Sequence, residues 1–268
     1  MLILAIDPGN VNSAYVLMEK ETYKPIEFGL LENNLVREKV LNLDYDCLAI
    51  EMVASYGMAV GESVFDTCVW IGRFIECAQE RNIPYTRVYR IEEKMTALKN
   101  EGRKAFITYT TAGLPDMETT KKIMFAQQEA GIDVMELGIP FSDPVADGPV
   151  IQAASYEAIQ KGATLTKIFT LMKEVRKEGL TTPVVFMMYY NTVYHYGLEE
   201  FVKMCAECGV DGLIIPDLPY EEQKEINAVL AENEAAPILI QLVSPVSKQR
   251  IPMIVNNARG FVYCVSQM

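Results

Sequence analysis

The chain has 268 residues, half of them hydrophobic, and a formal net charge of −12 at pH 7. This length and composition allow one large domain or two small ones, each with a substantial apolar core. The acidic balance argues against non-specific binding to nucleic acids, which requires clustered Lys and Arg. The apolar opening MLILAI lacks a preceding basic segment and ends at Asp7. We therefore expect a cytoplasmic protein without a signal peptide or a membrane span.

Six cysteines and one histidine offer little catalytic or metal chemistry. Most of the cysteines fall in apolar patterns and are expected to be buried free thiols; they are Cys47, Cys68, Cys77, Cys205, Cys208 and Cys264. Cys205 and Cys208 have CxxC spacing, but they lie in a helical pattern with no second pair and no histidine nearby, which disfavours a metal or redox site. His195 is expected in a surface loop.

The first third of the chain predicts a small α/β domain. Strands are expected at residues 2–7, 13–18, 26–31, 47–51 and 84–89, with helices at 33–41 and 63–79. Pro8-Gly9-Asn10 predicts a tight turn after the first strand. The longer helix has one apolar face, formed by Val64, Cys68, Ile71, Ile75 and Ala78. The resulting order, β-β-β-α-β-α-β, is ribonuclease-H-like.

Two segments of this part resemble the RuvC-type Holliday-junction resolvases: AIDPGNVNSAYVLM (5–18) and LAIEMVASYG (48–57). The resemblance implies that Asp7 and Glu51 help to hold Mg²⁺ ions that activate water. The remaining acids of that family come from a C-terminal helix without a counterpart here. Glu62 and Asp66 could point inward instead, or could lie on a solvated helix face. The DPG element alone also suits an ordinary β-turn, so a remnant nuclease site stays one of two interpretations.

The junction with the rest of the chain is abrupt. The strand ending near Arg90 runs directly into IEEKMTALKNEG (91–102), where Ile91, Met95 and Leu98 predict a helix ended by Gly102. Domains usually meet through exposed polar or Pro/Gly-rich linkers. We therefore expect two domains, residues 1–90 and 91–268, joined as in a fusion.

From residue 104 onward, strands alternate with amphipathic helices. Strands are expected to begin near Ala105, Ile132, Pro183, Gly212, Pro237 and Gly260, with helices at 117–130, 166–177, 198–208 and 221–233 and one opening near Pro149. This pattern predicts a parallel sheet covered by helices. Six strands fall short of the eight in a TIM (β/α)8 barrel. We expect an incomplete barrel whose first and sixth strands have open edges.

The segment MELGIPFSDPVADGPVIQ (135–152) carries the strongest candidate chemistry. Glu136 lies in an apolar, β-like run, where burial would raise the pKa of a carboxyl group. Asp147 follows in a Gly/Pro-rich loop of the kind that carries active sites in α/β folds. A protonated carboxyl beside an ionised one is an acid and base pair. Alternatively, Glu136 lies at a strand edge, and Asp143 and Asp147 only cap the next helix.

The same segment resembles the signature of the tryptophan synthase α subunit family. The similarity runs from about residue 91 to the end and includes AFITYTTAGLPD (105–116), MMYYNTVYHYG (187–197) and DGLIIPDLPYEE (211–222). It implies a lyase of tryptophan biosynthesis that cleaves indole-3-glycerol phosphate to indole and glyceraldehyde 3-phosphate. Glu136 would protonate indole C3 and take the glycerol hydroxyl proton. Asp147 would accept the indole N–H and stabilise the charge on the ring.

The resemblance also has implications for the surroundings of this pair. Tyr109, Tyr189 and Tyr263 match positions that line the family's indole pocket, although strand packing alone would account for them. Asp143 and Pro144 belong to a loop that faces the β subunit, which carries pyridoxal phosphate, so this part should need no cofactor. The family's phosphate-binding loops follow strands six to eight, and their expected loss puts activity in question. A lyase, a Mg²⁺-dependent junction nuclease and a non-catalytic fusion product all remain open.

Overall fold

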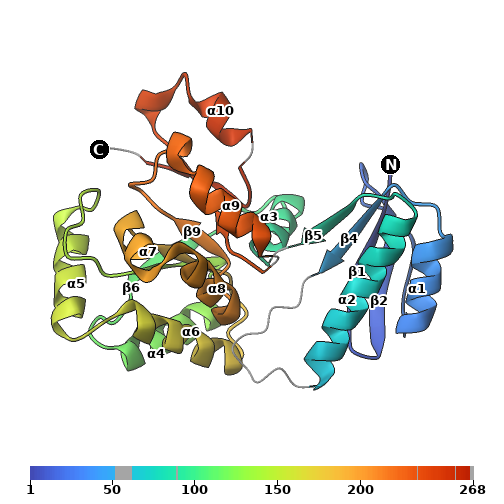
Figure 1. The fold of residues 1–268 in the computed structure, drawn as a ribbon, viewed down its shortest axis with the longest axis horizontal. Helices are drawn as coiled ribbons and strands as arrows, with labels where there is room; N and C mark the ends of the chain where they lie inside the picture. Colours follow the sequence, from blue (N-terminus) through green and yellow to red (C-terminus); the bar gives the residue numbers. More distant parts are fainter. Residues whose placement is uncertain (52–61, 89, 234, 257, 266–268) are drawn as a thin grey trace. The chain divides into compact units, whose positions relative to one another are not determined.

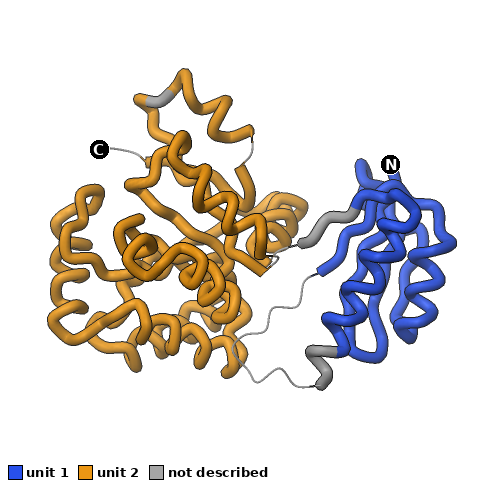
Figure 2. Tube along the Cα trace, viewed as in Figure 1, with its two compact units in different colours: residues 1–89 blue, residues 90–268 orange. Residues whose placement is uncertain are grey.

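The computed structural model describes residues 1–51, 62–88, 90–233, 235–256 and 258–265. The chain divides into two compact units, Met1–Tyr89 and Arg90–Met268, hereafter unit 1 and unit 2 (Figure 2). Each has its own apolar core, so each is described by itself. Within the described part of the chain, no helix is long and apolar enough to cross a membrane.

Unit 1 is a five-stranded sheet with two helices packed on one face (Figure 1). Its elements are β1 (Leu2–Asp7), β2 (Asn12–Glu19), β3 (Pro25–Glu32), α1 (Asn33–Asn42), β4 (Cys47–Glu51), α2 (Glu62–Glu80) and β5 (Tyr85–Val88). The strand order is β3-β2-β1-β4-β5. β1, β2 and β3 pair antiparallel, whereas β4 pairs parallel with both β1 and β5. Each expected strand and helix is present, with bounds shifted by a few residues.

The core of unit 1 lies between the sheet and the two helices. Because side chains alternate along a strand, every second residue of β1, β2 and β4 faces the helices; the buried ones include Leu4, Ile6, Tyr15, Leu17, Leu48 and Ile50. The expected apolar face of α2 is wrong at Cys68, which is exposed. The buried face instead includes Ile71, Phe74 and Ala78. The side chain of Val64 lies outside the described residues.

Unit 2 alternates strands and helices. Its elements are α3 (Arg90–Asn100), β6 (Ile107–Thr111), α4 (Met117–Glu129), β7 (Val134–Gly138), α5 (Pro149–Gln160), α6 (Leu165–Lys177), β8 (Val184–Met187), α7 (Tyr190–Tyr196), α8 (Leu198–Cys208), β9 (Gly212–Ile214), α9 (Lys224–Glu232), β10 (Ile238–Leu239), β11 (Gln241–Val243), α10 (Ile251–Val255) and β12 (Val262–Cys264), with 3-10 turns at Tyr220–Glu222 and Pro245–Ser247.

The strands of unit 2 pair in parallel and in chain order. β6 to β10 form one sheet, and β11 pairs with β12. Only Ile240 separates β10 from β11, and its amide donates to the carbonyl oxygen of Leu213 in β9 at 2.9 Å. The chain therefore passes from pairing with β9 to pairing with β12. If β10 and β11 are counted as one strand, the described part of unit 2 has six consecutive parallel strands, the number that the sequence predicts.

The two faces of this sheet carry different cores. The face toward the helices holds the larger one, which includes Leu137, Phe186 and Leu213. The other face, called the inner face below, holds Val134, Val185, Ile214, Ile238 and Ile240. Ile91 of α3 is fully buried in this second core, so α3 covers the inner face where the strands begin.

Two short helices of unit 2 have no counterpart in the predicted elements. α7 begins directly after Tyr189 and α10 begins at Ile251. His195 lies exposed in the last turn of α7, so its expected place in a loop is wrong. A helix of seven residues contains too few turns for apolar periodicity to mark it. The predicted caps of α4 do appear: the Asp116 side chain accepts from the Thr119 amide at 2.7 Å, and Gly131 has a φ of 79°.

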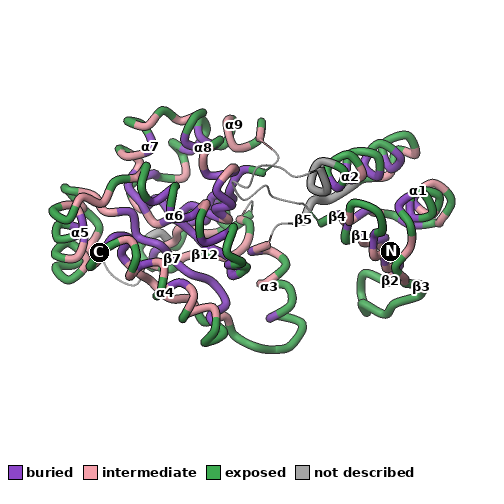
Figure 3. The backbone as a smooth tube through the Cα atoms, turned by 90° about the horizontal axis from the view of Figure 1, so that it is seen from below, coloured by how far each residue is buried: buried purple, intermediate pink, exposed green. Residues whose placement is uncertain are grey.

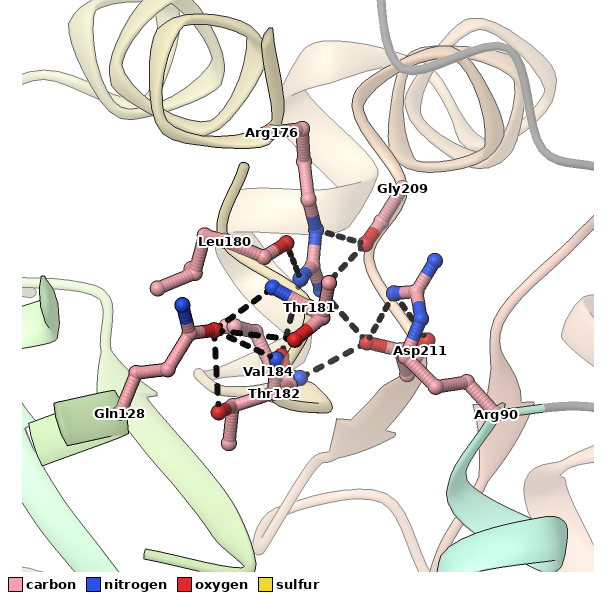
Figure 4. Close-up of polar contacts among 9 residues, drawn as sticks. All are labelled: Arg90, Gln128, Arg176, Leu180, Thr181, Thr182, Val184, Gly209 and Asp211. Carbon is pink, nitrogen blue, oxygen red and sulfur yellow. Dashed lines mark hydrogen bonds and ion pairs between the residues drawn. The ribbon is translucent and has the colours of Figure 1, made fainter. Parts of the chain in front are cut away.

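A buried ionic cluster joins α3, α6 and the start of β9 (Figure 4). The Asp211 carboxylate accepts from Arg176 at 2.7 Å, from Arg90 at 2.8 and 3.0 Å, and from the Val184 amide at 2.7 Å. Arg176 also donates to the carbonyl oxygens of Leu180, Thr182 and Gly209. Burial lowers the pKa of Arg176 to about 10, against the opposing effect of Asp211. The guanidinium therefore stays charged at neutral pH.

Candidate active site

Glu136 is a buried carboxyl group on the inner face of the unit 2 sheet. It lies in the middle of β7, is 7% exposed, and is paired in register with Tyr109 of β6 and Val185 of β8. Burial raises its pKa from 4.5 to about 7, because a charged carboxylate is poorly solvated there. A group that is half protonated near neutral pH can both donate and accept a proton.

Tyr109 lies directly beside this carboxyl group. Its ring packs on Gly138 so closely that a Cβ atom on Gly138 would lie 2.1 Å from the Tyr109 hydroxyl oxygen. The Thr111 hydroxyl lies 3.5 Å from the same oxygen. Burial raises the pKa of Tyr109, and the negative charges of Asp147 and Glu136 raise it further. The Tyr109 hydroxyl therefore lies within electrostatic range of both carboxyl groups.

Asp147 is half-buried in the loop of residues 139–148 between β7 and α5. Tyr189 holds this loop in two ways. Its hydroxyl oxygen accepts a hydrogen bond from the Ala146 amide at 2.9 Å, and its ring stacks on Phe141 with a centroid distance of 5.1 Å. Burial raises the pKa of Tyr189 to about 12, and the charge of Asp147 also raises it. The two contacts fix the loop just before Asp147.

Tyr263 of β12 completes the group from the far end of the strand series. It is partly buried and packs in the inner-face core. Burial raises its pKa, and the charges of Glu136 and Asp147 raise it as well. All three predicted tyrosines therefore lie within electrostatic range of Asp147, and Tyr109 and Tyr263 also lie within range of Glu136. The tyrosines come from β6, β12 and the segment after β8. In the same loop, Asp143 is exposed and Pro144 is half-buried.

Gly138 and Phe141 were not singled out from the sequence, although both contact predicted residues. Gly138 stands at the end of β7, where only a residue without a side chain leaves room for the Tyr109 ring. Phe141 supports Tyr189 by stacking. The sequence signal for Gly138 is its position at the end of an apolar run, whereas Phe141 has no signal beyond its place in the loop.

The two candidate metal ligands of unit 1 lie at neighbouring strand ends. Ile6 of β1 is paired with Ile50 of β4, so Asp7 and Glu51, both exposed, follow at the same end of the sheet. Among the described residues, no group of three or more His, Cys, Asp or Glu is arranged to hold a metal ion. Asp66 is exposed. The side chain of Glu62 and residues 52–57 of the resolvase-like segment lie outside the described residues.

The six thiols range from buried to exposed, with Cys47 half-buried. Cys205 and Cys208 are buried on α8, and burial raises the pKa of Cys208 to about 12. Such thiols stay protonated, which makes them poor nucleophiles and poor metal ligands. Cys68 and Cys264 are exposed, so the expectation of buried thiols is wrong for these two.

Comparisons with known proteins agree on unit 2. The family model described as "Tryptophan synthase alpha chain" matches residues 95–268. The tryptophan synthase alpha chain of Lachnospira eligens is 75% identical over 179 residues, which are 67% of this chain and 68% of that relative. The corresponding chain of a Thermoanaerobacter species is 51% identical over 66% of each chain. The present chain thus spans about two thirds of the length of these relatives.

Solved structures show the same relationship. Tryptophan synthase subunit alpha from Legionella pneumophila str. Paris superposes with a TM-score of 0.63 at 37% identity, over 67% of this chain and 68% of that one. The tryptophan synthase complex from Pyrococcus furiosus gives a TM-score of 0.57 at 38% identity, over 60% and 66%. The α/β fold of unit 2 is therefore shared with these proteins. On the family match and the identity of its relatives, the chain belongs to the tryptophan synthase alpha chain family.

Proposed function

We propose that unit 2 carries a tryptophan synthase α-type lyase site that cleaves indole-3-glycerol phosphate to indole and glyceraldehyde 3-phosphate. The observation that carries the proposal is Glu136: a buried carboxyl group with a pKa near 7, paired in register with Tyr109, whose own pKa is raised by the charges of Glu136 and Asp147. Proton transfer in both directions at neutral pH requires such a group. Family membership supplies the substrate class.

The proposed reaction is a retro-aldol cleavage in two proton transfers. Protonated Glu136 donates its proton to indole C3, which leaves a positive charge shared with the ring nitrogen. Asp147 accepts the indole N–H and stabilises that charge. The Glu136 carboxylate then takes the proton of the glycerol hydroxyl. The carbon–carbon bond breaks, its electron pair returns to the ring, and the former carbinol carbon becomes the aldehyde.

The tyrosines are assigned two kinds of role. We assign Tyr109 and Tyr263 to the walls around the indole ring, since both lie near the two carboxyl groups. Tyr189 was expected in the same wall, and its bond to Ala146 additionally supports a role in positioning the Asp147 loop. The two roles of Tyr189 differ in one respect: a residue of the pocket wall touches the substrate, whereas a residue that only positions the loop does not.

A partner is proposed for the exposed loop that carries Asp143 and Pro144. One structural relative belongs to the tryptophan synthase complex from Pyrococcus furiosus. We propose that a β subunit docks on this loop and carries the pyridoxal phosphate. The proton transfers assigned to unit 2 need no cofactor of their own.

Indole release tests the proposal. The full chain is incubated with indole-3-glycerol phosphate over a wide concentration range, alone and with a β subunit, so that weak binding is not mistaken for inactivity. Glu136→Gln should abolish release, whereas Glu129→Gln, an exposed glutamate at the end of α4, should leave it unchanged. No indole from the unmodified chain with the β subunit present would refute the lyase and favour a non-catalytic product of fusion.

A second candidate function concerns unit 1. Its strand order, and the position of Asp7 and Glu51 at adjacent strand ends, support the proposal that residues 1–90 form a RuvC-like, ribonuclease-H-like domain fused to residues 91–268. Mg²⁺-dependent cleavage of branched DNA is the matching assay. Asp7→Asn should remove it and Asp44→Asn, at an exposed position after α1, should not. Cleavage that persists in Asp7→Asn would exclude this site.

A further inference from the structure

In the described part of unit 1, the sheet has one face without helices. Both α1 and α2 pack on the side of Leu4 and Leu48, while the alternate residues point the other way. In Figure 3 the two helices lie on one side of the strands. The outward residues of the four strands with described side chains are apolar except near one end: Ile3, Ala5, Ala14, Val16, Met18, Ile26, Phe28, Leu30, Cys47 and Ala49. We call these ten residues the open face.

The open face has a raised edge and a flat centre. Ile26, Phe28 and Leu30 of the edge strand β3 are 55%, 74% and 69% exposed. Along one row across the sheet, Phe28 is paired with Val16, Val16 with Ala5, and Ala5 with Ala49. Side-chain size therefore falls from the edge to the centre, which makes a ridge beside a floor of alanines.

The exposed apolar surface of the ridge is as extensive as the largest apolar patch of a typical monomer. The three ridge side chains together leave on the order of 350 Å² exposed, and patches of about 300–600 Å² are often functional. With the floor included, about 600 Å² could be covered on each copy, or roughly 1,200 Å² in total. That total lies at the lower limit of specific protein–protein interfaces.

We propose that the open face is a self-association surface on which a second copy of this chain packs sheet against sheet. A two-fold axis parallel to the strands places the ridge of each copy over the alanine floor of the other, so one surface supplies both complementary shapes. A nucleic-acid partner does not suit it, because the face is apolar and the chain carries a net charge of −12. The same axis brings Asp7 and Glu51 of both copies to one end, where they repel.

Sedimentation equilibrium of the full chain tests this arrangement. Between about 1 and about 200 µM, the unmodified chain should show a monomer–dimer equilibrium with a dissociation constant on the order of 10 µM. Phe28→Lys should raise that constant at least about tenfold, because it places a charge in the apolar contact. Val69→Lys is the matched control: Val69 is equally apolar and 49% exposed, but it lies on α2. Raising NaCl from about 0.05 to about 0.5 M should tighten the dimer by screening the acids.

The outcomes separate cleanly. A dimer weakened by Phe28→Lys and unchanged by Val69→Lys supports the proposal, and Leu30→Lys repeats the test if circular dichroism shows that the first variant is unfolded. A chain that stays monomeric throughout, including one in which another part of the same chain covers the open face, overturns it. So does a dimer that Phe28→Lys leaves intact or that Val69→Lys weakens equally.

Discussion

Glu136→Gln should make the protein more stable at alkaline pH while it removes the proposed acid and base. The native pKa of about 7 exceeds the ordinary 4.5, so the folded state holds a proton that the unfolded chain releases. The contribution of Glu136 to the free energy of unfolding therefore falls as pH rises from 4.5 to 7. A difference of about 2.5 pKa units corresponds to about 3 kcal/mol. Because glutamine carries no charge at any pH, the variant should be up to about 3 kcal/mol more stable at pH 8 and equal to the parent below pH 4.5.

Urea unfolding at several pH values measures this difference. The chain has one tryptophan, Trp70 in α2, so tryptophan fluorescence follows unit 1 while far-ultraviolet circular dichroism also follows unit 2. Only the unit 2 transition should shift, and Glu129→Gln should leave it in place. If the difference between Glu136→Gln and its parent stays constant within about 0.5 kcal/mol from pH 5 to pH 8, the carboxyl group is not held protonated by burial, and the acid role fails with it.

Three further substitutions test other contacts of unit 2. Gly138→Ala places a methyl group 2.1 Å from the β6 tyrosine hydroxyl, so we expect a loss of about 1–3 kcal/mol in urea unfolding and slower indole release. Asp211→Asn removes the carboxylate that pairs with the buried guanidinium of Arg176 and should cost about 3–5 kcal/mol; a smaller loss in the unit 2 transition would contradict the cluster's role. Tyr189→Phe removes the acceptor of the Ala146 amide, whose hydrogen exchange should accelerate while the aromatic stack persists.

Elements with a long, regular apolar pattern were predictable from the sequence. The run containing Glu136 is apolar on both sides, and it forms a strand buried on both faces, with the carboxyl group among its buried residues. A continuous apolar run predicts such a strand because both faces of a parallel sheet are covered. The run does not indicate which face carries the carboxyl group; the pairing of Glu136 with Tyr109 shows that both lie on the inner face.

Features that depend on contacts between distant residues were not predictable. Arg90 and Asp211 are separated by 121 positions, and neither stands in a motif that marks an ion pair. The hydrogen bond from Ala146 to Tyr189 joins two loops that only the packed sheet brings together. Cys68 shows a different limit: one helix has several apolar residues near its buried stripe, and spacing alone does not say which of them the sheet covers.

Helix α3 limits the access of water to Glu136 from the end of the sheet where the strands begin. It lies across the beginnings of the strands, where Ile91 is buried and the ion pairs Arg90–Asp211 and Glu92–Arg259 fasten its first turn. Apolar packing and these ion pairs therefore close the inner face at the end where the strands begin. In the proposed reaction, Glu136 would exchange its proton with solvent at the opposite strand ends, where residues 139–148 present Asp147.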